Sequence, residues 1–469
     1  MPDAVSKLPE FIQQGEPARL IPTVADTSRE QRITSAVLAV LSSVDEFGKK
    51  MLHMVGAPVT KTAKIRAFTE VVFCGAQVEK DARPDGLILV TLGSRRWSAI
   101  VEAKVGNSEL TRQQIEAYLD VARDHKVDAL ITVSNQFAPL PTHHPVDVDR
   151  RKTRNVALYH WSWTEVLSEA RLLAEHKGVS DPDQAYVLGE LIRYLEHPGS
   201  GVLSFGQMGS GWRDICNAVQ NAASLSRNSP KVTAVASDWH QLLRFIALQM
   251  SVTVGRTVKV QMSRAHAADA ARRLSDTVGR LLESHCLEGE FEIPDAAARL
   301  RLCADLNRRT LTAAMRLRAP TDRVRATSLV TWALRQVSRC DDPALLIRAM
   351  WPGRAHDTAA TLGRLREDRR SILSKTTSAP VAFEFARVLD AAGRFKGSRT
   401  FVEDTVNLPP AFYADVGQHL RAWIPPAPKV SKQVAANAEK PSAISSQSTA
   451  QSDSQRPSAE SRGAARLPA

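Results

Sequence analysis

Residues 83–105 read RPDGLILVTLGSRRWSAIVEAKV, and this stretch decides the fold of the first half of the chain. Two apolar runs with strand-like composition, 85–92 and 96–105, flank the dipeptide Gly93-Ser94. A two-residue connection containing glycine between two such runs is typical of a tight antiparallel turn. The sequence therefore predicts a β-hairpin centred between these two residues.

The predicted hairpin brings three charged side chains together. With the turn at that position, Asp85 falls opposite Glu102, and facing residues of an antiparallel pair share one face. The two-residue period of a strand adds Lys104 to the same face, and this parity holds even if the loop differs. Leu87 and Ile100 continue the face as an apolar surface. Two carboxylates and an ammonium are thus expected at one end of a mainly hydrophobic face.

The segments around the hairpin alternate between helical and extended patterns. We expect a helix from Ser28, a helical piece near 46–56, a strand at 64–73, the hairpin, a helix within 108–126, strands at 127–134 and 155–163, and helices at 164–176 and 183–197. The order α-β-β-β-α-β-β-α across 28–175 predicts an α/β domain.

The charged cluster suits phosphodiester hydrolysis. Asp85 and Glu102, with the backbone carbonyl of Ala103, supply the hard oxygen ligands that Mg²⁺ prefers. Such an ion polarises a phosphate and lowers the pKa of a bound water, while Lys104 orients that water and offsets developing charge. A plain cross-strand ion pair, which needs one carboxylate and one lysine, is the structural alternative.

The motifs resemble the PD-(D/E)xK nuclease superfamily. Pro84-Asp85 matches its first motif and Glu102-Ala103-Lys104 its second, with a strand and turn between them. The resemblance covers about a third of the chain, and it implies a restriction-endonuclease-like αβββαβ core. It also implies Asp85, Glu102 and Lys104 as catalytic residues, with Mg²⁺ or Mn²⁺ held by Asp85, Glu102 and Ala103.

Further residues fit this resemblance. RecB-type members carry Gln-x-x-x-Tyr on the next helix, here Gln114 and Tyr118, and i, i+4 spacing places both on one helix face. They would position substrate or support the site, and core packing of Tyr118 is a compatible alternative. Many members also have an acidic residue on the first helix. Glu30 and Glu70 are both candidates, and the sequence does not choose between them.

Beyond residue 212 the pattern predicts a second, α+β domain with an antiparallel sheet. Strands are expected within 256–263, 289–295, 298–306 and 310–319. In the last two strands, side chains alternate between the two faces, so the leucines lie on one face and a basic set lies on the other. The basic set consists of Arg299, Arg301, Arg316 and Arg318. This face is either a nucleic-acid surface or a solvated outer face.

Composition bounds the class of protein. The 469 residues carry 62 Lys+Arg against 50 Asp+Glu, which favours polyanionic partners. Five scattered cysteines, without a Cys-x-x-Cys pair, argue against a disulfide framework and against structural zinc. No signal peptide or apolar segment of membrane-spanning length is evident, so we expect a cytoplasmic protein without a membrane partner.

We therefore expect a flexible arm at 1–27, a nuclease-like domain at 28–200, a Gly-rich linker at 201–212, an α+β domain at 213–425 and a disordered tail at 426–469. The predicted function is Mg²⁺-dependent hydrolysis of nucleic acid, DNA rather than RNA, in defence or DNA processing, with a protein partner on the second domain as a further expectation. The alternative is a catalytically inactive nucleic-acid-binding or adaptor protein on the same fold.

Overall fold

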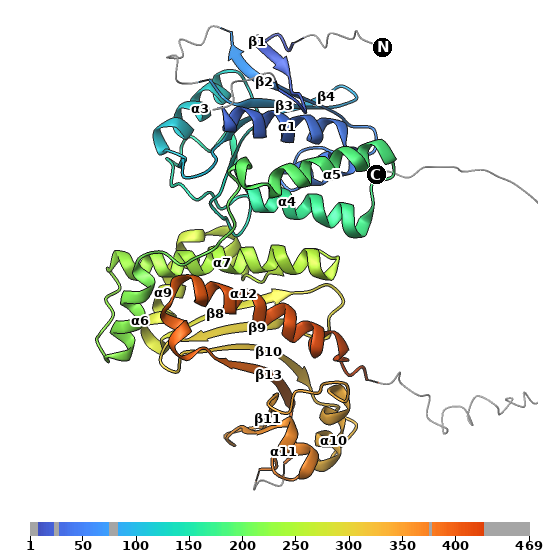
Figure 1. Cartoon of the computed structure of the whole chain (residues 1–469), viewed down its shortest axis with the longest axis vertical. Helices are drawn as coiled ribbons and strands as arrows, with labels where there is room; N and C mark the ends of the chain where they lie inside the picture. The colour runs from blue at the N-terminus through green and yellow to red at the C-terminus, as the bar shows by residue number, and fades with distance from the viewer. Residues whose placement is uncertain (1–7, 23–27, 75–82, 375–377, 426–469) are drawn as a thin grey trace, which may run out of the picture. The chain divides into compact units, whose positions relative to one another are not determined.

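The computed structural model describes residues 8–22, 28–74, 83–374 and 378–425 (Figure 1). The described residues up to Trp423 belong to one compact unit. This unit is a mixed α/β structure with two separate sheets. The predicted disordered tail, 426–469, lies outside the described residues.

The first sheet has six strands in chain order along the sheet. They are β1 (Ile12–Pro17), β2 (Lys64–Phe73), β3 (Gly86–Leu92), β4 (Arg95–Ala103), β5 (Ala129–Ser134) and β6 (Ala157–Ser162). The first four pair antiparallel, whereas β4, β5 and β6 are parallel. The change of direction falls at β4, which carries the predicted Glu-Ala-Lys motif.

Helices cover both faces of this sheet. Alternate strand residues such as Ile88 and Val90 face a core shared with α1 (Arg29–Ser43), α2 (Asp45–His53), α4 (Trp163–Leu172) and α5 (Pro182–Glu196). The residues between them, such as Leu87 and Leu89, face α3 (Arg112–Asp124). Two-sided burial explains why β3 and β5 are continuous apolar runs.

The hairpin register matches the sequence-based prediction. Leu87 lies opposite Ile100, and Leu92 lies opposite Arg95 across the turn. Gly93 has φ +59°, a left-handed conformation that glycine adopts without steric cost. The register therefore follows from the position and length of the turn.

The expected flexible arm at 1–27 is wrong for part of its length. Residues Ile12–Pro17 form strand β1, which pairs antiparallel with β2 through two register irregularities. The segment IQQGEP has no apolar alternation, and it contains Gly and Pro, so its own sequence gives no strand signal. The open edge of β2 supplies the backbone partners that order it.

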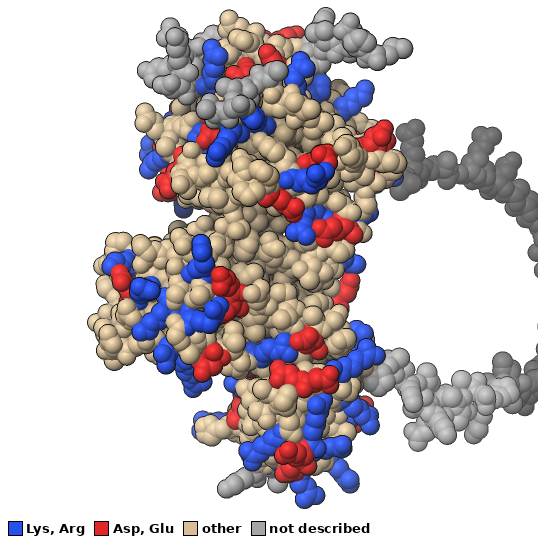
Figure 2. All heavy atoms as spheres, in the orientation of Figure 1, with Lys and Arg blue, Asp and Glu red and all other residues tan. Residues whose placement is uncertain are grey.

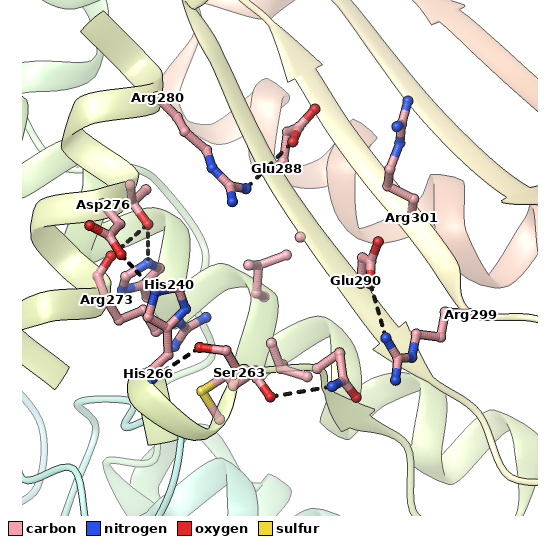
Figure 3. Close-up of a pocket in the computed structure, with 16 residues that line it drawn as sticks. His240, Ser263, His266, Arg273, Asp276, Arg280, Glu288, Glu290, Arg299 and Arg301 are labelled. Atoms are coloured by element: carbon pink, nitrogen blue, oxygen red, sulfur yellow. Dashed lines mark hydrogen bonds and ion pairs between the residues drawn. The ribbon is translucent and has the colours of Figure 1, made fainter. Parts of the chain in front are cut away.

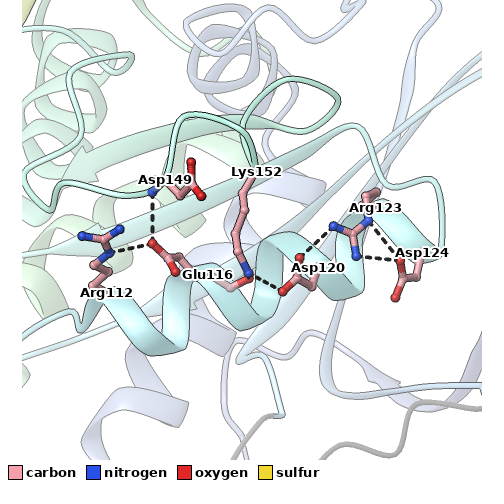
Figure 4. A network of polar contacts seen from close by, with 7 residues as sticks. All are labelled: Arg112, Glu116, Asp120, Arg123, Asp124, Asp149 and Lys152. Atoms are coloured by element: carbon pink, nitrogen blue, oxygen red, sulfur yellow. Dashed lines mark hydrogen bonds and ion pairs between the residues drawn. The ribbon is translucent and has the colours of Figure 1, made fainter.

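The outer surface of α3 is tied to the loop between β5 and β6 (Figure 4). Glu116 accepts hydrogen bonds from Arg112 Nε at 2.6 Å and from the backbone N–H of Asp149 at 3.0 Å. One turn further on, Asp120 pairs with Lys152. Exposed ion pairs add little stability. Their effect here is to link α3 to this loop while its opposite face packs on the sheet.

The second sheet contains β7 to β13, and all its strand pairs are antiparallel, as expected. Its strands are β7 (Lys259–Val260), β8 (Cys286–Glu292), β9 (Leu300–Asp305), β10 (Thr310–Arg318), β11 (Leu346–Met350), β12 (Thr358–Thr361) and β13 (Ala382–Asp390). The last three strands have no counterpart in the sequence-based prediction.

Seven helices surround the second sheet in the described residues. They are α6 (Gly211–Gln220), α7 (Pro230–Val254), α8 (Arg264–Ala268), α9 (Ala270–Ser284), α10 (Ala326–Gln336), α11 (Leu362–Glu367) and α12 (Ser398–Asp415). Residues of α7 and α12 share a core with inward-facing residues of β9 and β10 (Figure 1).

The connection between the two sheets is anchored at its start. Asn135, just after β5, donates to the carbonyl of Gly201 at 2.9 Å and accepts from the N–H of Leu203 at 2.9 Å. Helix α6 begins at Gly211, so the expected linker 201–212 is helical over its last two residues. Because both sheets belong to one compact unit, the domain boundaries stay a prediction.

Two expectations about the class of protein can be compared with the structure. All five cysteines are free, which agrees with the absence of a disulfide framework. Among the described residues, no helix combines the length and apolar character required to cross a bilayer.

Candidate active site

The end of the first hairpin carries the predicted carboxylates. Asp85 directly precedes β3 and Glu102 lies near the end of β4, so continuing the register places them opposite each other. Asp85 Oδ2 accepts the backbone N–H of Ala103 at 2.7 Å. This bond fixes the Asp85 carboxylate against β4, beside the buried Glu102.

Lys104 joins both ends of the cluster. Its Nζ donates to Glu102 Oε1 at 2.7 Å and to Glu30 Oε2, on the first turn of α1, at 3.3 Å. Two hydrogen bonds hold the backbone of Lys104. Its N–H donates to the Val133 carbonyl at 2.8 Å, and Trp163 Nε1 donates to the Lys104 carbonyl at 2.7 Å. The ammonium is therefore presented from a fixed backbone position.

Gln114 and Tyr118 reach the same cluster from α3. Gln114 Nε2 donates to Glu102 Oε1 at 2.8 Å. The Tyr118 hydroxyl donates to the carbonyl of Arg83, two residues before Asp85, at 3.0 Å. Tyr118 is fully buried in the core beneath α3. Core packing and support of the site thus both apply to Tyr118.

The structure distinguishes the two acidic candidates. Glu30 contacts Lys104 and lines a cleft of about 460 Å³ together with Asp85. Glu70, at φ +53° within β2, accepts a hydrogen bond from Gln31 at 3.0 Å instead. Among the contacts of the described residues, Glu30 is the acidic side chain that joins Lys104 from α1.

Burial and mutual repulsion shift the acidities in this cluster. Burial, followed by the charge of Glu102, raises the pKa of Asp85 well above its ordinary value. Burial also raises the pKa of Glu102, although Lys104 opposes the shift. For Lys104, burial opposes the charged form, but the charge of Glu102 and then that of Asp85 outweigh it and raise the ammonium pKa. Lys104 is therefore cationic at neutral pH. Its single positive charge cannot neutralise both neighbouring carboxyl groups when both are ionised.

One oxygen of the cluster lacks a partner. Glu102 Oε1 receives both Lys104 and Gln114, whereas Glu102 Oε2 is buried without any hydrogen-bond partner. A buried, unpaired carboxylate oxygen is costly unless a cation or donor meets it. No three His, Cys, Asp or Glu side chains of the described residues form a metal-binding group. A cation here would need the mixed set predicted from the sequence: two carboxylates, a backbone carbonyl and water.

The cleft adds residues that the sequence-based prediction missed. Arg29 and Ser108 line it beside Asp85 and Glu30, and both can contact a phosphate. Arg29 is adjacent to Glu30 at the start of α1, so the same capping signal that locates Glu30 also locates Arg29.

The four arginines of the second sheet take no part in this cluster. As predicted, Leu300, Leu302 and Leu317 are buried, and the arginines lie on the other side. That side is not purely basic, since Arg299 pairs with Glu290 at 3.7 Å and Arg301 pairs with Glu384 at 3.9 Å. Arg316 and Arg318 line a separate groove. On the face seen in Figure 2, basic and acidic side chains lie interspersed.

A buried polar row next to Glu102 was also missed. Thr132, adjacent to Glu102 in the parallel ladder, contacts His144 Nε2 and His160 Nδ1, each at 2.8 Å. His160 Nε2 lies 2.9 Å from the Gln136 carbonyl, so it carries the proton and Nδ1 accepts. The signal available in the sequence was a polar residue in the middle of each of two strands, Thr132 in β5 and His160 in β6.

The Pro-rich segment PLPTHHPVD, residues 139–147, indicates a pair of surface histidines, but neither His143 nor His144 is exposed in the structure. His143 is buried, and its Nε2 lies 2.8 Å from the Ala267 carbonyl. His144 packs edge-on against His160 in the polar row. These contacts could not be predicted from the Pro-rich segment alone, because they join residues far apart in the chain.

This row predicts acid sensitivity. Burial lowers the pKa of His144 to about 4 and that of His160 to about 3, below the ordinary value near 6.5 in the unfolded chain. Below pH 6.5 the unfolded state therefore binds more protons, and each histidine costs about 1.4 kcal/mol of stability per pH unit as the pH falls. Urea unfolding from pH 7.5 to 4.5 should show this slope. His160→Gln should flatten it, whereas the exposed His53→Gln should not.

Comparison of the chain with protein-family models, with curated proteins and with solved structures found no match. The resemblance to the PD-(D/E)xK superfamily thus stays a prediction from sequence motifs. The functional argument rests on the contacts described above.

Proposed function

We propose that this protein is a metal-dependent nuclease of the PD-(D/E)xK type, with a restriction-endonuclease-like core and DNA as the preferred substrate. The observation that carries the proposal is the unpaired, buried Glu102 Oε2 beside Asp85 and Lys104. A structural ion pair needs one carboxylate and one lysine, and it would gain nothing from a second buried carboxyl group.

The donor set suits Mg²⁺ or Mn²⁺. The carboxylates of Asp85 and Glu102 and the carbonyl of Ala103 would hold the ion, since all three offer hard oxygen. When bound, such an ion polarises the phosphate and makes a bound water more acidic. Burial is the main cause that raises the pKa of both carboxyl groups, and a divalent cation between them would stabilise their charged forms.

The remaining residues have roles that follow from their contacts. Lys104 stays protonated, so it acts as a cation that orients the attacking water and offsets charge on the phosphate, not as a general base. Gln114 holds Glu102 Oε1, and Glu30 holds the other side of Lys104. Arg29 and Ser108 in the cleft would bind the flanking phosphates.

A second candidate is a non-catalytic nucleic-acid-binding or adaptor protein on the same fold. The observation that favours it is the lack, among described residues, of a group of three metal-ligating side chains. Such a protein would bind DNA in a salt-sensitive manner without needing metal.

A cleavage assay tests the proposal. The purified full chain is incubated with plasmid, linear and single-stranded DNA and with RNA, in Mg²⁺ or Mn²⁺. We expect cleavage that EDTA abolishes, and a melting temperature that rises with added metal, because ligands of the folded state stabilise it. Binding without cleavage, unchanged by EDTA, would favour the adaptor; cleavage that ignores EDTA would exclude this metal-dependent site.

A further inference from the structure

A second cavity, of about 390 Å³, lies at the edge of β8 in the second half of the chain (Figure 3). Its wall comes from α7, α9, β8, β9 and the segment that follows β7. The charged lining consists of four arginines and three carboxylates: Arg273, Arg280, Arg299, Arg301, Asp276, Glu288 and Glu290. None of these residues belongs to the candidate active site.

The three carboxylates each have a cationic or histidine partner. Asp276 accepts from His266 Nε2 at 2.8 Å. Glu288 pairs with Arg280 at 3.6 Å, and Glu290 pairs with Arg299 at 3.7 Å (Figure 3). Each of these carboxylates thus already has a partner, and one cation in the wall is left without one.

Arg273 is that cation. Its side chain is on α9, the residue is 6% exposed, and its Nη1 is buried without a hydrogen-bond partner. Within the described parts of the chain, no carboxylate lies within ion-pair distance of Arg273. Burial lowers its pKa to about 10, which still leaves the guanidinium charged at neutral pH. A buried cation without a partner costs several kcal/mol, so an anion is missing from its surroundings.

The neighbouring His240 cannot supply or receive that charge. Burial lowers the pKa of His240 to about 3, so it is neutral. Its Nε2 lies 2.8 Å from Thr277 Oγ1, which itself donates to the Arg273 carbonyl. His240 therefore donates to Thr277 through Nε2 and brings no charge to the cavity.

We propose that this cavity binds a small phosphate-bearing molecule, with the phosphate on the guanidinium of Arg273. The planar guanidinium binds phosphate oxygens with paired hydrogen bonds. The volume is in the range of small-molecule sites and far exceeds that of a single water, about 30 Å³. Leu243, Val260 and Met262 in the wall offer an apolar surface for the rest of the ligand. The inference does not depend on nuclease activity.

Isothermal titration of the full chain tests this site. The probes are inorganic phosphate, adenosine 5′-monophosphate and adenosine, each at the same ionic strength set with chloride. Binding of phosphate and the nucleotide alike identifies free phosphate as a sufficient ligand, and binding of the nucleotide alone identifies a phosphate ester. Binding of adenosine as tight as that of the nucleotide, or no binding of either phosphate probe, would overturn the proposal.

Variants assign the binding to Arg273. We expect Arg273→Met to weaken binding about 10- to 100-fold, the loss expected for hydrogen bonds to a charged group. Without ligand, this variant should melt at or above the wild-type temperature, because it removes an uncompensated buried charge. Arg272→Met, one residue away and absent from the lining, is the matched control and should change neither quantity.

Two further variants separate the alternatives. Arg273→Lys keeps the charge but not the paired geometry, so we expect weaker binding in a protein that folds normally. Arg29→Met should leave this phosphate binding intact, because Arg29 lines the cleft of the candidate active site and not this cavity. If Arg273→Lys binds the nucleotide as tightly as the wild type, or if Arg29→Met removes the binding, the phosphate does not lie on Arg273.

Discussion

We expect replacement of Asp85 with asparagine to lower metal-dependent cleavage at least about 1000-fold, the scale typical of losing a central catalytic electrostatic group. Asparagine keeps the oxygen that accepts the Ala103 N–H at 2.7 Å, so the backbone contact survives. It removes the charge that a divalent cation needs. Initial rates on plasmid DNA at saturating Mg²⁺ measure the effect.

The same substitution makes a prediction about stability that separates catalysis from folding. Because burial and Glu102 raise the pKa of Asp85, a neutral side chain is tolerated there in the absence of metal. Asp85→Asn should therefore melt at or above the wild-type temperature in EDTA, and lose the stabilisation by Mg²⁺. Asp124→Asn, an exposed change on α3, should retain both activity and the metal response. An active Asp85→Asn variant would remove Asp85 from the catalytic site.

The hairpin could be predicted from sequence because local constraints coincide there. Gly93-Ser94 sets the turn, and the length of that turn fixes the register of the two strands. The strand at 12–17 could not be predicted, because its order depends on the edge of β2, a partner distant in the chain. The strands β11 and β12 could not be predicted either, because neither is longer than five residues and so short a segment shows no clear alternation.

The candidate site divides in the same way. Parity along β4 and helix spacing along α3 place Glu102, Lys104, Gln114 and Tyr118, because each relation is local or crosses one tight turn. The choice of Glu30 required the tertiary position of α1 relative to Lys104. An i, i+2 or i, i+4 argument carries no information about that distance.

The cavity around Arg273 could not be predicted from the sequence, for a different reason. The hydrophobic stripe of α9 predicts which residues face inward, and an arginine is ordinarily assigned to the outer face. That Arg273 is buried, and that no carboxylate meets it, are facts of tertiary packing. Residues that depart from the usual burial pattern, such as a buried arginine without an acidic partner, are expected at functional positions.

Replacing Lys104 with methionine should lower the cleavage rate about 100- to 1000-fold at saturating metal, because a preorganised cation at the reacting phosphate is lost. Methionine preserves most of the side-chain length in a site where the Lys104 ammonium is largely buried between Glu102 and Glu30. The loss should appear in kcat with KM little changed, since Lys104 acts on the transition state and not on substrate affinity.

Lys104→Arg supplies the discriminating comparison, because it keeps a positive charge beside Glu102 but widens the donor. We expect activity between those of the wild type and the methionine variant, whereas a lysine that served as a general base would be lost equally in both. A rate that rises with pH as the lysine loses its proton, and that loses this rise in Lys104→Arg, would identify such a base, contrary to the raised pKa of this ammonium. Lys49→Met, which removes an ion pair with Asp45 on α2, should leave the rate unchanged and so exclude a general effect of losing a lysine.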